Sequence, residues 1–327
     1  MVRPLVREHT QLGRYNRSMG LLLCAGVDNL EQWRLELSSA LGGESIAVWP
    51  DIADPAAIHI ALVAKPPRGA LASLPNLRLT CSLWAGVDGL LADPSFPRGV
   101  PLTRLIDPQL SASMVESVVM HVMNAHRMAP RYRAQAVRSE WRQHEQPTAA
   151  ERTVGILGFG ELGRACAEAL LPFGFNVCGW SRSQRSHPAI DCHSGEEGLS
   201  RMLERCNIVV LLLPNTEDTR GLVDATRIAM LSPGATVINV GRGATIDDDA
   251  LLAALDRGHV EAAILDVFAT EPLPPAHRYW THPRVWVYPH VAAETDARSA
   301  SRVVADTVRR WRAGLPLPEL VDVGRGY

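Results

Sequence analysis

A glycine-rich turn between a predicted strand and a predicted helix constrains the fold of this chain most strongly. Gly158, Gly160 and Gly163 form a GxGxxG pattern directly after the apolar run 154–157 and at the start of the helix-compatible segment 161–171. In that context the first glycine permits a tight turn, the second lets a pyrophosphate approach the backbone, and the third lets helix and strand pack closely. The helix N-terminus then faces the anion. The pattern therefore predicts a dinucleotide-binding βαβ unit.

Apolar runs alternate with helix-compatible segments along most of the chain. The strand-like runs lie at 20–24, 45–49, 58–63, 77–82 and 100–105, and again at 154–157, 176–180, 207–213, 235–240, 262–267 and 285–289. Such alternation is typical of parallel sheets covered by helices. We expect an α/β protein with two doubly wound parallel-sheet lobes, a flavodoxin-like first lobe and a Rossmann cofactor lobe, and a cleft between them.

A long apolar helix predicted at 111–128 and the polar segment 131–152 that follows it indicate a boundary between the two lobes. A last helix is expected at 296–313, packed back on the first lobe. Residues 1–18 carry four arginines and lack the apolar region of a secretory signal. We expect them to be a disordered extension, or a mis-assigned start upstream of Met19.

Composition and charge narrow the class of function. The chain has 327 residues, of which 46% are apolar, and a formal net charge of −2. That charge gives no general attraction to nucleic acid or to an anionic membrane, and no apolar run reaches the roughly 18 residues needed to span a bilayer. The six cysteines form no CxxC pair, so reduced thiols in a cytoplasmic protein are expected. We expect a small-molecule substrate, no nucleic acid and no membrane.

One group of potential metal ligands, His187 with Asp191, Cys192 and His193, matches no usual ligand spacing. A solvated loop explains it better than a metal hydrolase, and no metal is expected.

The end of the predicted strand 176–180 indicates which dinucleotide binds. An acidic residue there would accept hydrogen bonds from the ribose 2′-hydroxyl of NAD, but the chain continues Ser181-Arg182-Ser183. Arg182 supplies the charge and the planar donor geometry that a 2′-phosphate needs. The residues favour NADPH, with NADH still possible. The alternative is a solvated surface arginine.

Three ionisable residues, Arg242, Glu271 and His290, follow successive late strands, where loops converge on the ligand crevice of a doubly wound sheet. Reduction of a ketone needs a proton donor and a positive charge. His290 can be the general acid, an adjacent Glu271 would raise its pKa, and Arg242 can bind a carboxylate. Asp266 could accept a hydrogen bond from a nicotinamide carboxamide. Each residue alone also has an ordinary explanation as a cap, turn or loop residue.

The motifs together identify a family resemblance. The segments are the glycine turn 158–163, Trp180-Ser-Arg-Ser, Leu211-Leu-Leu-Pro-Asn-Thr, Asn239-Val-Gly-Arg-Gly, Leu265-Asp-Val-Phe, Glu271-Pro-Leu-Pro-Pro and Pro289-His-Val-Ala-Ala. In this order and spacing they resemble the D-isomer-specific 2-hydroxyacid dehydrogenases, and within them the bacterial glyoxylate/hydroxypyruvate reductase A subgroup. The resemblance runs from about Gly20 to the terminal Arg325-Gly-Tyr.

The resemblance implies reduction of a small 2-keto acid, such as glyoxylate or hydroxypyruvate, to the D-2-hydroxy acid by a homodimer. It implies a substrate-binding (catalytic) domain at 19–112 and 295–327, and an NAD(P)-binding domain at 113–294 with a dimerisation arm around 125–150. The implied catalytic residues are Arg242, Glu271 and His290. The implied cofactor contacts are Gly158, Phe159, Gly160, Glu161, Leu162, Gly163, Ser181, Arg182, Ser183, Leu213, Pro214, Thr216, Val240, Gly241, Arg242, Asp266, His290 and Ala292. The implied substrate contacts are Trp84, Ala85, Gly86, Val87, Arg242 and His290, with backbone N–H groups at 85–88 holding the substrate carboxylate.

Two residues depart from the family pattern and bear on the substrate. Trp84 stands where relatives have a small residue, so its indole narrows the pocket, stacks on a substrate side chain, or packs into the core of its lobe. Glu294 is acidic where an apolar residue is usual. A dehydrogenase for a bulkier 2-keto acid is therefore one alternative, and a non-catalytic dinucleotide-sensing protein like the corepressors of this fold is another. Trp141, in the polar segment, could reach the partner subunit's active site or lie in an interface.

Overall fold

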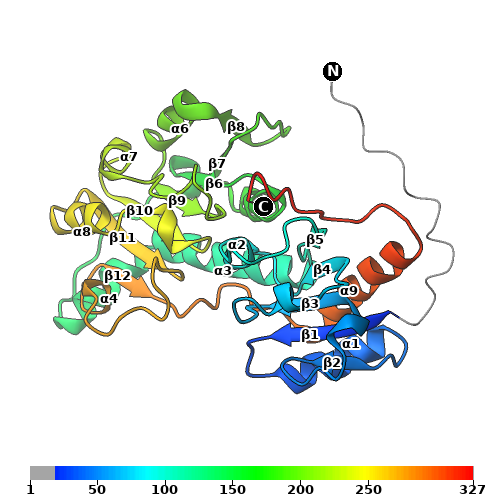
Figure 1. The fold of residues 1–327 in the computed structure, drawn as a ribbon. Helices are drawn as coiled ribbons and strands as arrows, with labels where there is room; N and C mark the ends of the chain where they lie inside the picture. The colour runs from blue at the N-terminus through cyan, green and yellow to red at the C-terminus, as the bar shows by residue number, and fades with distance from the viewer. Residues whose placement is uncertain (1–18, 327) are drawn as a thin grey trace. The chain divides into compact units, whose positions relative to one another are not determined.

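The computed structural model describes residues 19–326, and the predicted extension 1–18 lies outside the described residues. The chain divides into two compact units (Figure 1). One comprises the described residues up to Leu110 together with those from Thr295 onward, and the other comprises Ser111–Glu294.

The first unit contains a five-stranded parallel sheet in the order β2-β1-β3-β4-β5. This is the flavodoxin-like order expected from the sequence. Its strands are β1 (Gly20–Ala25), β2 (Ile46–Val48), β3 (Ile58–Ala64), β4 (Leu79–Ser82) and β5 (Leu102–Thr103), and its helices are α1 (Leu30–Ala40), α2 (Asp88–Leu91) and α9 (Ala297–Arg312).

The second unit contains a seven-stranded parallel sheet in the order β12-β11-β10-β9-β6-β7-β8. Starting from β8, this is the Rossmann order with one additional edge strand. The strands are β6 (Thr153–Leu157), β7 (Asn176–Ser181), β8 (Asp191–Ser194), β9 (Ile208–Leu211), β10 (Ala235–Asn239), β11 (Val260–Leu265) and β12 (Val285–Val287). The helices are α3 (Pro108–His126), which begins just before the boundary, α4 (Ala129–Val137), α5 (Glu161–Leu170), α6 (Gly195–Leu203), α7 (Ala225–Met230) and α8 (Asp248–Asp256). Two parallel-sheet α/β lobes are thus confirmed.

The final helix shows how local sequence sets the packing of the first unit. Its N-cap Asp296 accepts a hydrogen bond from the Ser299 N–H at 2.8 Å. Ala300, Val304 and Val308 recur every fourth residue on one helical face and are buried in the core shared with α1. The C-terminal segment therefore completes the same unit that the N-terminal strands begin.

One segment was predicted wrongly, because the loop expected around Asp191–Ser194 is the edge strand β8, which pairs with β7. The polar segment after Met128, for which no helix was predicted, contains α4. An edge strand pairs on one side only, so this short polar strand lacks the apolar pattern of the inner strands. His187 contacts Glu168 at 3.2 Å and His193 contacts Asp191 at 3.1 Å. Among residues 19–326, no helix combines the length and apolar character that crossing a bilayer requires.

Candidate active site

His290 and Glu271 form a hydrogen-bonded pair at the carboxyl ends of strands in the seven-stranded sheet. Glu271 follows β11 and His290 follows β12, and because these strands are parallel neighbours their carboxyl ends lie at the same edge. His290 Nδ1 lies 2.7 Å from Glu271 Oε2, and Glu271 Oε1 accepts a hydrogen bond from the Phe268 N–H at 2.9 Å. When Nδ1 donates its proton to the carboxylate, Nε2 is the ring nitrogen left to exchange a proton with another molecule.

The pair shifts the pKa values of its two members in opposite directions. The hydrogen bond to Glu271 raises the pKa of His290 above its ordinary value, against the opposing effects of burial and of the Arg242 charge. Burial disfavours the Glu271 carboxylate, but the hydrogen bonds from His290 and from the Phe268 N–H outweigh burial and lower its pKa. The histidine therefore stays protonated further into the neutral range, beside a carboxylate that stays ionised.

Asp266 holds the backbone loop that carries His290. Its carboxylate oxygens accept hydrogen bonds from the N–H groups of Val291 at 2.8 Å and Ala292 at 2.9 Å, and its carbonyl accepts one from the His290 N–H at 2.8 Å. His290 has a φ of 58°, in the left-handed region that a residue other than glycine occupies only where its surroundings hold it. Both oxygens of this buried carboxylate thus position the loop, a function that sequence reasoning did not assign to Asp266.

Arg242 follows β10, the neighbour of β11. Its charge lowers the pKa values of both Glu271 and His290, so the guanidinium acts on the pair electrostatically. A methyl group on Gly243 would lie 1.9 Å from the carbonyl carbon of Phe268. The loop after β10 therefore packs directly on the loop after β11, and the structure brings all three predicted side chains to one edge of the sheet.

The glycine turn has the geometry that the sequence predicts. Gly158 has a φ of 105°, and the N–H groups of Gly158 and Phe159 both donate to the Trp180 carbonyl at 2.9 Å. A methyl group on Gly163 would lie 2.1 Å from the Gly158 oxygen, so α5 packs tightly on the turn. A methyl group on Gly160, in contrast, would meet no atom within 4 Å. The open space before the first turn of α5, which contains Glu161 and Leu162, fits a pyrophosphate.

The loop after β9 borders the same turn. Its Thr219 hydroxyl donates to the Pro214 carbonyl at 2.6 Å and accepts from the Thr216 N–H at 2.9 Å, which fixes the loop's shape. Within the described residues, the buried Asn215 Oδ1 has no hydrogen-bond partner. A buried acceptor without a partner is costly unless a ligand or water satisfies it, so this loop also fits a bound dinucleotide. The remaining cofactor candidates are placed nearby in the fold: Leu213 in the same loop, Val240 and Gly241 directly after β10, and Ala292 beside His290.

The end of β7 is organised around Arg182. The Ser181 hydroxyl donates to the Ser183 carbonyl at 2.7 Å, which shapes the turn. Arg182 Nη1 lies 3.2 Å from Asp218 Oδ2, and Asp218 belongs to the loop after β9. Sequence reasoning did not single out Asp218, because nothing in its own segment marks it. The strand end itself carries no carboxylate, as predicted, but one approaches Arg182 from the neighbouring loop.

Four predicted substrate contacts, Trp84, Ala85, Gly86 and Val87, lie in the first unit between β4 and α2, whereas the catalytic candidates lie in the second. The Ser82 hydroxyl accepts from the Trp84 N–H at 3.1 Å and donates to the Trp84 carbonyl at 2.8 Å. The half-buried indole packs against the core of the first unit. Trp84 thus packs within the first unit, in the segment that precedes α2.

Comparisons with known proteins identify the family to which the chain is similar. Residues 119–292 match the model of the D-isomer specific 2-hydroxyacid dehydrogenase NAD binding domain. The chain is 38% identical to glyoxylate/hydroxypyruvate reductase A from Serratia proteamaculans, over 91% of this chain and 97% of the relative. A D-isomer specific 2-hydroxyacid dehydrogenase from Xanthobacter autotrophicus, solved with NADPH and MES, superposes with a TM-score of 0.91 at 40% identity, covering 95% of this chain and 100% of that one. An NADPH-dependent glyoxylate/hydroxypyruvate reductase from Sinorhizobium meliloti, solved with NADP and sulfate, gives 0.89 at 37% identity over 94% and 99%.

Proposed function

The chain belongs to the D-isomer specific 2-hydroxyacid dehydrogenase family of NAD(P)-dependent oxidoreductases, and we propose that it reduces a small 2-keto acid such as glyoxylate or hydroxypyruvate, with NADPH as preferred cofactor. The observation that carries the proposal is the His290–Glu271 pair under the influence of the Arg242 charge. An acid of raised pKa and an arginine at the carboxyl edge of a dinucleotide-binding sheet are the two groups that ketone reduction requires.

The proposed mechanism assigns roles to Arg242, His290 and Glu271. A bound reduced nicotinamide supplies the hydride. Arg242 binds the carboxylate of the keto acid and polarises the carbonyl, while His290 Nε2 gives its proton to the ketone oxygen as negative charge develops there. Glu271 stabilises the protonated ring and fixes its orientation. The backbone N–H groups at 85–88 are proposed as the second hold on the carboxylate.

The cofactor contacts are assigned to the second unit. The glycine turn 158–163 is proposed to hold the pyrophosphate, and Asn215 with Pro214 and Thr216 to lie along the nicotinamide ribose. Ser181, Arg182 and Ser183 are proposed to bind the 2′-phosphate, which is what favours NADPH over NADH. The solved relatives with bound NADPH and NADP support this choice.

Arg182→Ala should therefore lower kcat/KM for NADPH by about 10- to 100-fold, since a hydrogen bond to a charged group contributes roughly 1.5 to 3 kcal/mol. The kcat/KM for NADH should stay close to the wild-type value. Steady-state kinetics with both cofactors measure this, with Arg257→Ala, an exposed arginine after α8, as control. An unchanged Michaelis constant for NADPH in Arg182→Ala would contradict the assignment.

Glu271→Gln should shift the pH dependence of keto acid reduction. Reduction needs protonated His290, so the rate falls as pH rises through the His290 pKa, which Glu271 raises. Without that carboxylate the pKa falls, and the alkaline limb of the profile of kcat/KM against pH moves to lower pH. A limb at an unchanged pH would show that Glu271 does not act through the histidine.

A substrate panel with NADPH tests the reaction itself. We expect turnover of glyoxylate and hydroxypyruvate, as the names of the curated relatives indicate for those proteins. Higher kcat/KM for phenylpyruvate or 2-ketogluconate would instead identify a dehydrogenase for bulkier keto acids and assign Trp84 to the substrate pocket. Binding of NADPH without turnover of any keto acid would favour a dinucleotide sensor.

We also propose that the chain forms a homodimer through the arm around residues 125–150. This arm carries Val137 and Trp141, whose exposed fractions are 85% and 95% in the single chain. Apolar side chains this exposed are typical of surfaces that another chain covers.

The double variant Val137→Glu/Trp141→Glu should sediment as a monomer, because two buried carboxylates would oppose association. Trp280→Glu, at a tryptophan that is 51% exposed outside the arm, is the matched control and should stay dimeric. Analytical ultracentrifugation distinguishes the species. A monomeric wild-type chain would refute the proposed dimer.

A further inference from the structure

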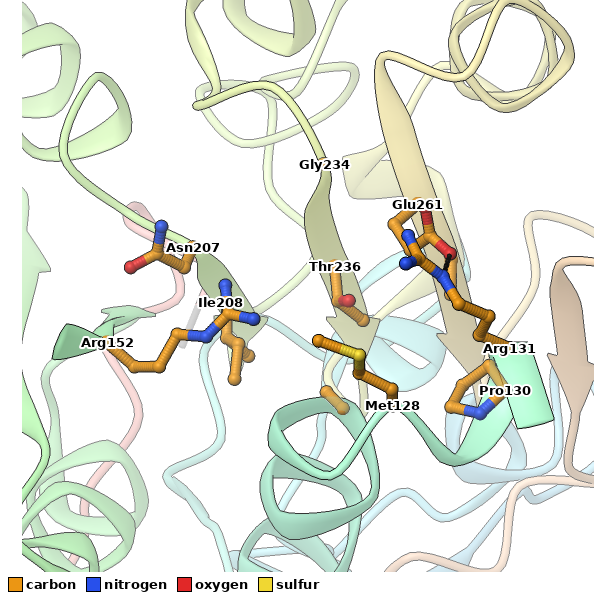
Figure 2. A pocket seen from close by; sticks show the side chains of 11 residues that line it. Met128, Pro130, Arg131, Arg152, Asn207, Ile208, Gly234, Thr236 and Glu261 are labelled. Carbon is orange, nitrogen blue, oxygen red and sulfur yellow. Dashed lines mark hydrogen bonds and ion pairs between the residues drawn. The ribbon is translucent and has the colours of Figure 1, made fainter. Parts of the chain in front are cut away.

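A polar pocket lies at the amino-terminal ends of the strands in the second unit's sheet. Arg152 precedes β6, Thr236 is near the start of β10, and Glu261 near the start of β11, while Arg131 enters from α4 (Figure 2). The pocket is small, with a cavity volume of about 50 Å³, and it opens to solvent. The candidate active site lies at the carboxyl ends of the same strands, so this pocket is separate from it.

The charges that line the pocket do not balance. Arg131 Nε forms an ion pair with Glu261 Oε1 at 2.7 Å. Arg152, in contrast, makes no side-chain hydrogen bond or ion pair with any residue in the described part of the chain, and its Nε is shielded from solvent without a partner. Burial and the neighbouring Arg131 charge lower the pKa of Arg152, against a smaller opposing effect of the adjacent Glu151 carboxylate. Two guanidinium groups and one carboxylate leave one positive charge.

The arrangement of the donors suits a ligand at the amino-terminal ends of the strands. Figure 2 shows Arg152 extending into the pocket from one side and Arg131 beside Glu261 on the other. Thr236 lies on β10, the strand between β9 and β11. Its hydroxyl makes no hydrogen bond to another residue of 19–326, so it can donate to a ligand. A guanidinium with free donors, next to a hydroxyl, is a typical environment for a phosphate or a carboxylate.

We propose that this pocket binds a small oxyanion, with Arg152 as its charged anchor and Thr236 as a second donor. The inference does not rest on the proposed keto acid reduction, since it concerns the other end of the strands, although Arg131 also belongs to the arm proposed to form the dimer. It makes the pocket a second ligand site, one that a phosphate or a small carboxylate could occupy while the dinucleotide site is filled.

The test follows thermal unfolding of the NADPH-bound protein, so that the Arg182 site is already filled. Inorganic phosphate and, separately, acetate are titrated at constant ionic strength. We expect a saturable rise in Tm of about 2 to 4 °C at roughly ten times Kd for at least one of the two anions. Arg152→Gln should weaken binding by about tenfold or more, as expected for loss of a charged donor. Arg201→Gln, at an exposed arginine of α6, should bind like the wild type.

The same variants test whether lost anion binding, and not a loss of stability, causes the difference in Tm. Because Arg152 makes no bond that folding requires, Arg152→Gln should unfold at the wild-type temperature or above it in anion-free buffer, and below the wild type once the anion saturates. Thr236→Val should give a smaller loss of affinity. A Tm that does not saturate with either anion, an equal response of Arg152→Gln and wild type, or an equal loss in Arg201→Gln would overturn the proposal.

Discussion

His290→Ala should lower kcat for keto acid reduction by about 10² to 10⁴, the usual contribution of a positioned general acid. In the structure the Nδ1 side of the ring is bound to Glu271 at 2.7 Å, which leaves Nε2 for the substrate. Loss of the imidazole removes the proton donor for the ketone oxygen, so the negative charge that develops there during hydride transfer is no longer neutralised. Single-turnover and steady-state rates with NADPH and glyoxylate measure the effect.

The backbone of His290 calls for a second variant. Alanine is unfavourable at a φ of 58°, whereas asparagine tolerates the left-handed region well. His290→Asn should therefore keep the loop that Asp266 holds, and still lose as much activity as His290→Ala. If His290→Asn keeps near-wild-type turnover, loop geometry and not proton transfer explains the alanine result.

The strands and the glycine turn could be predicted because each is encoded locally. Residues 154–157 and 235–240 are apolar runs of strand length beside turn residues, and they correspond to β6 and β10. β8 could not be recognised, since Asp191–Ser194 pairs on one side only and needs no apolar pattern. α4 was missed because much of its surface is polar and only Pro130 and Gln135 are buried.

The site was predictable where one residue type performs a recognisable chemical task at the end of a strand. Arg242, Glu271 and His290 meet that condition. The hydrogen bonds of Asp266 to Val291 and Ala292 join positions 25 and 26 residues apart. The ion pair of Arg182 with Asp218 joins positions 36 residues apart. These contacts depend on how neighbouring loops fold over one edge, which periodicity and composition do not encode.

Arg242→Ala should lower kcat/KM for the keto acid by about 10² to 10³, mainly through a higher Michaelis constant, because a paired charged hydrogen bond to a carboxylate is lost. Arg242→Lys should recover part of the loss, since lysine keeps the charge without the planar pair of donors. Arg257→Ala again serves as the control. A wild-type Michaelis constant for the keto acid in Arg242→Ala would refute the anchoring role.

The pH profile of the same variant separates anchoring from a general disturbance of the site. The Arg242 charge lowers the pKa of His290, whereas the Glu271 hydrogen bond raises it. Removing Arg242 should therefore move the alkaline limb of keto acid reduction to higher pH, opposite to the shift expected for Glu271→Gln. If the substitutions only distorted the loops, the alkaline limb would move in the same direction in both variants, or would not move in either. Opposite shifts in the two variants would show that both residues act on one proton, held at His290.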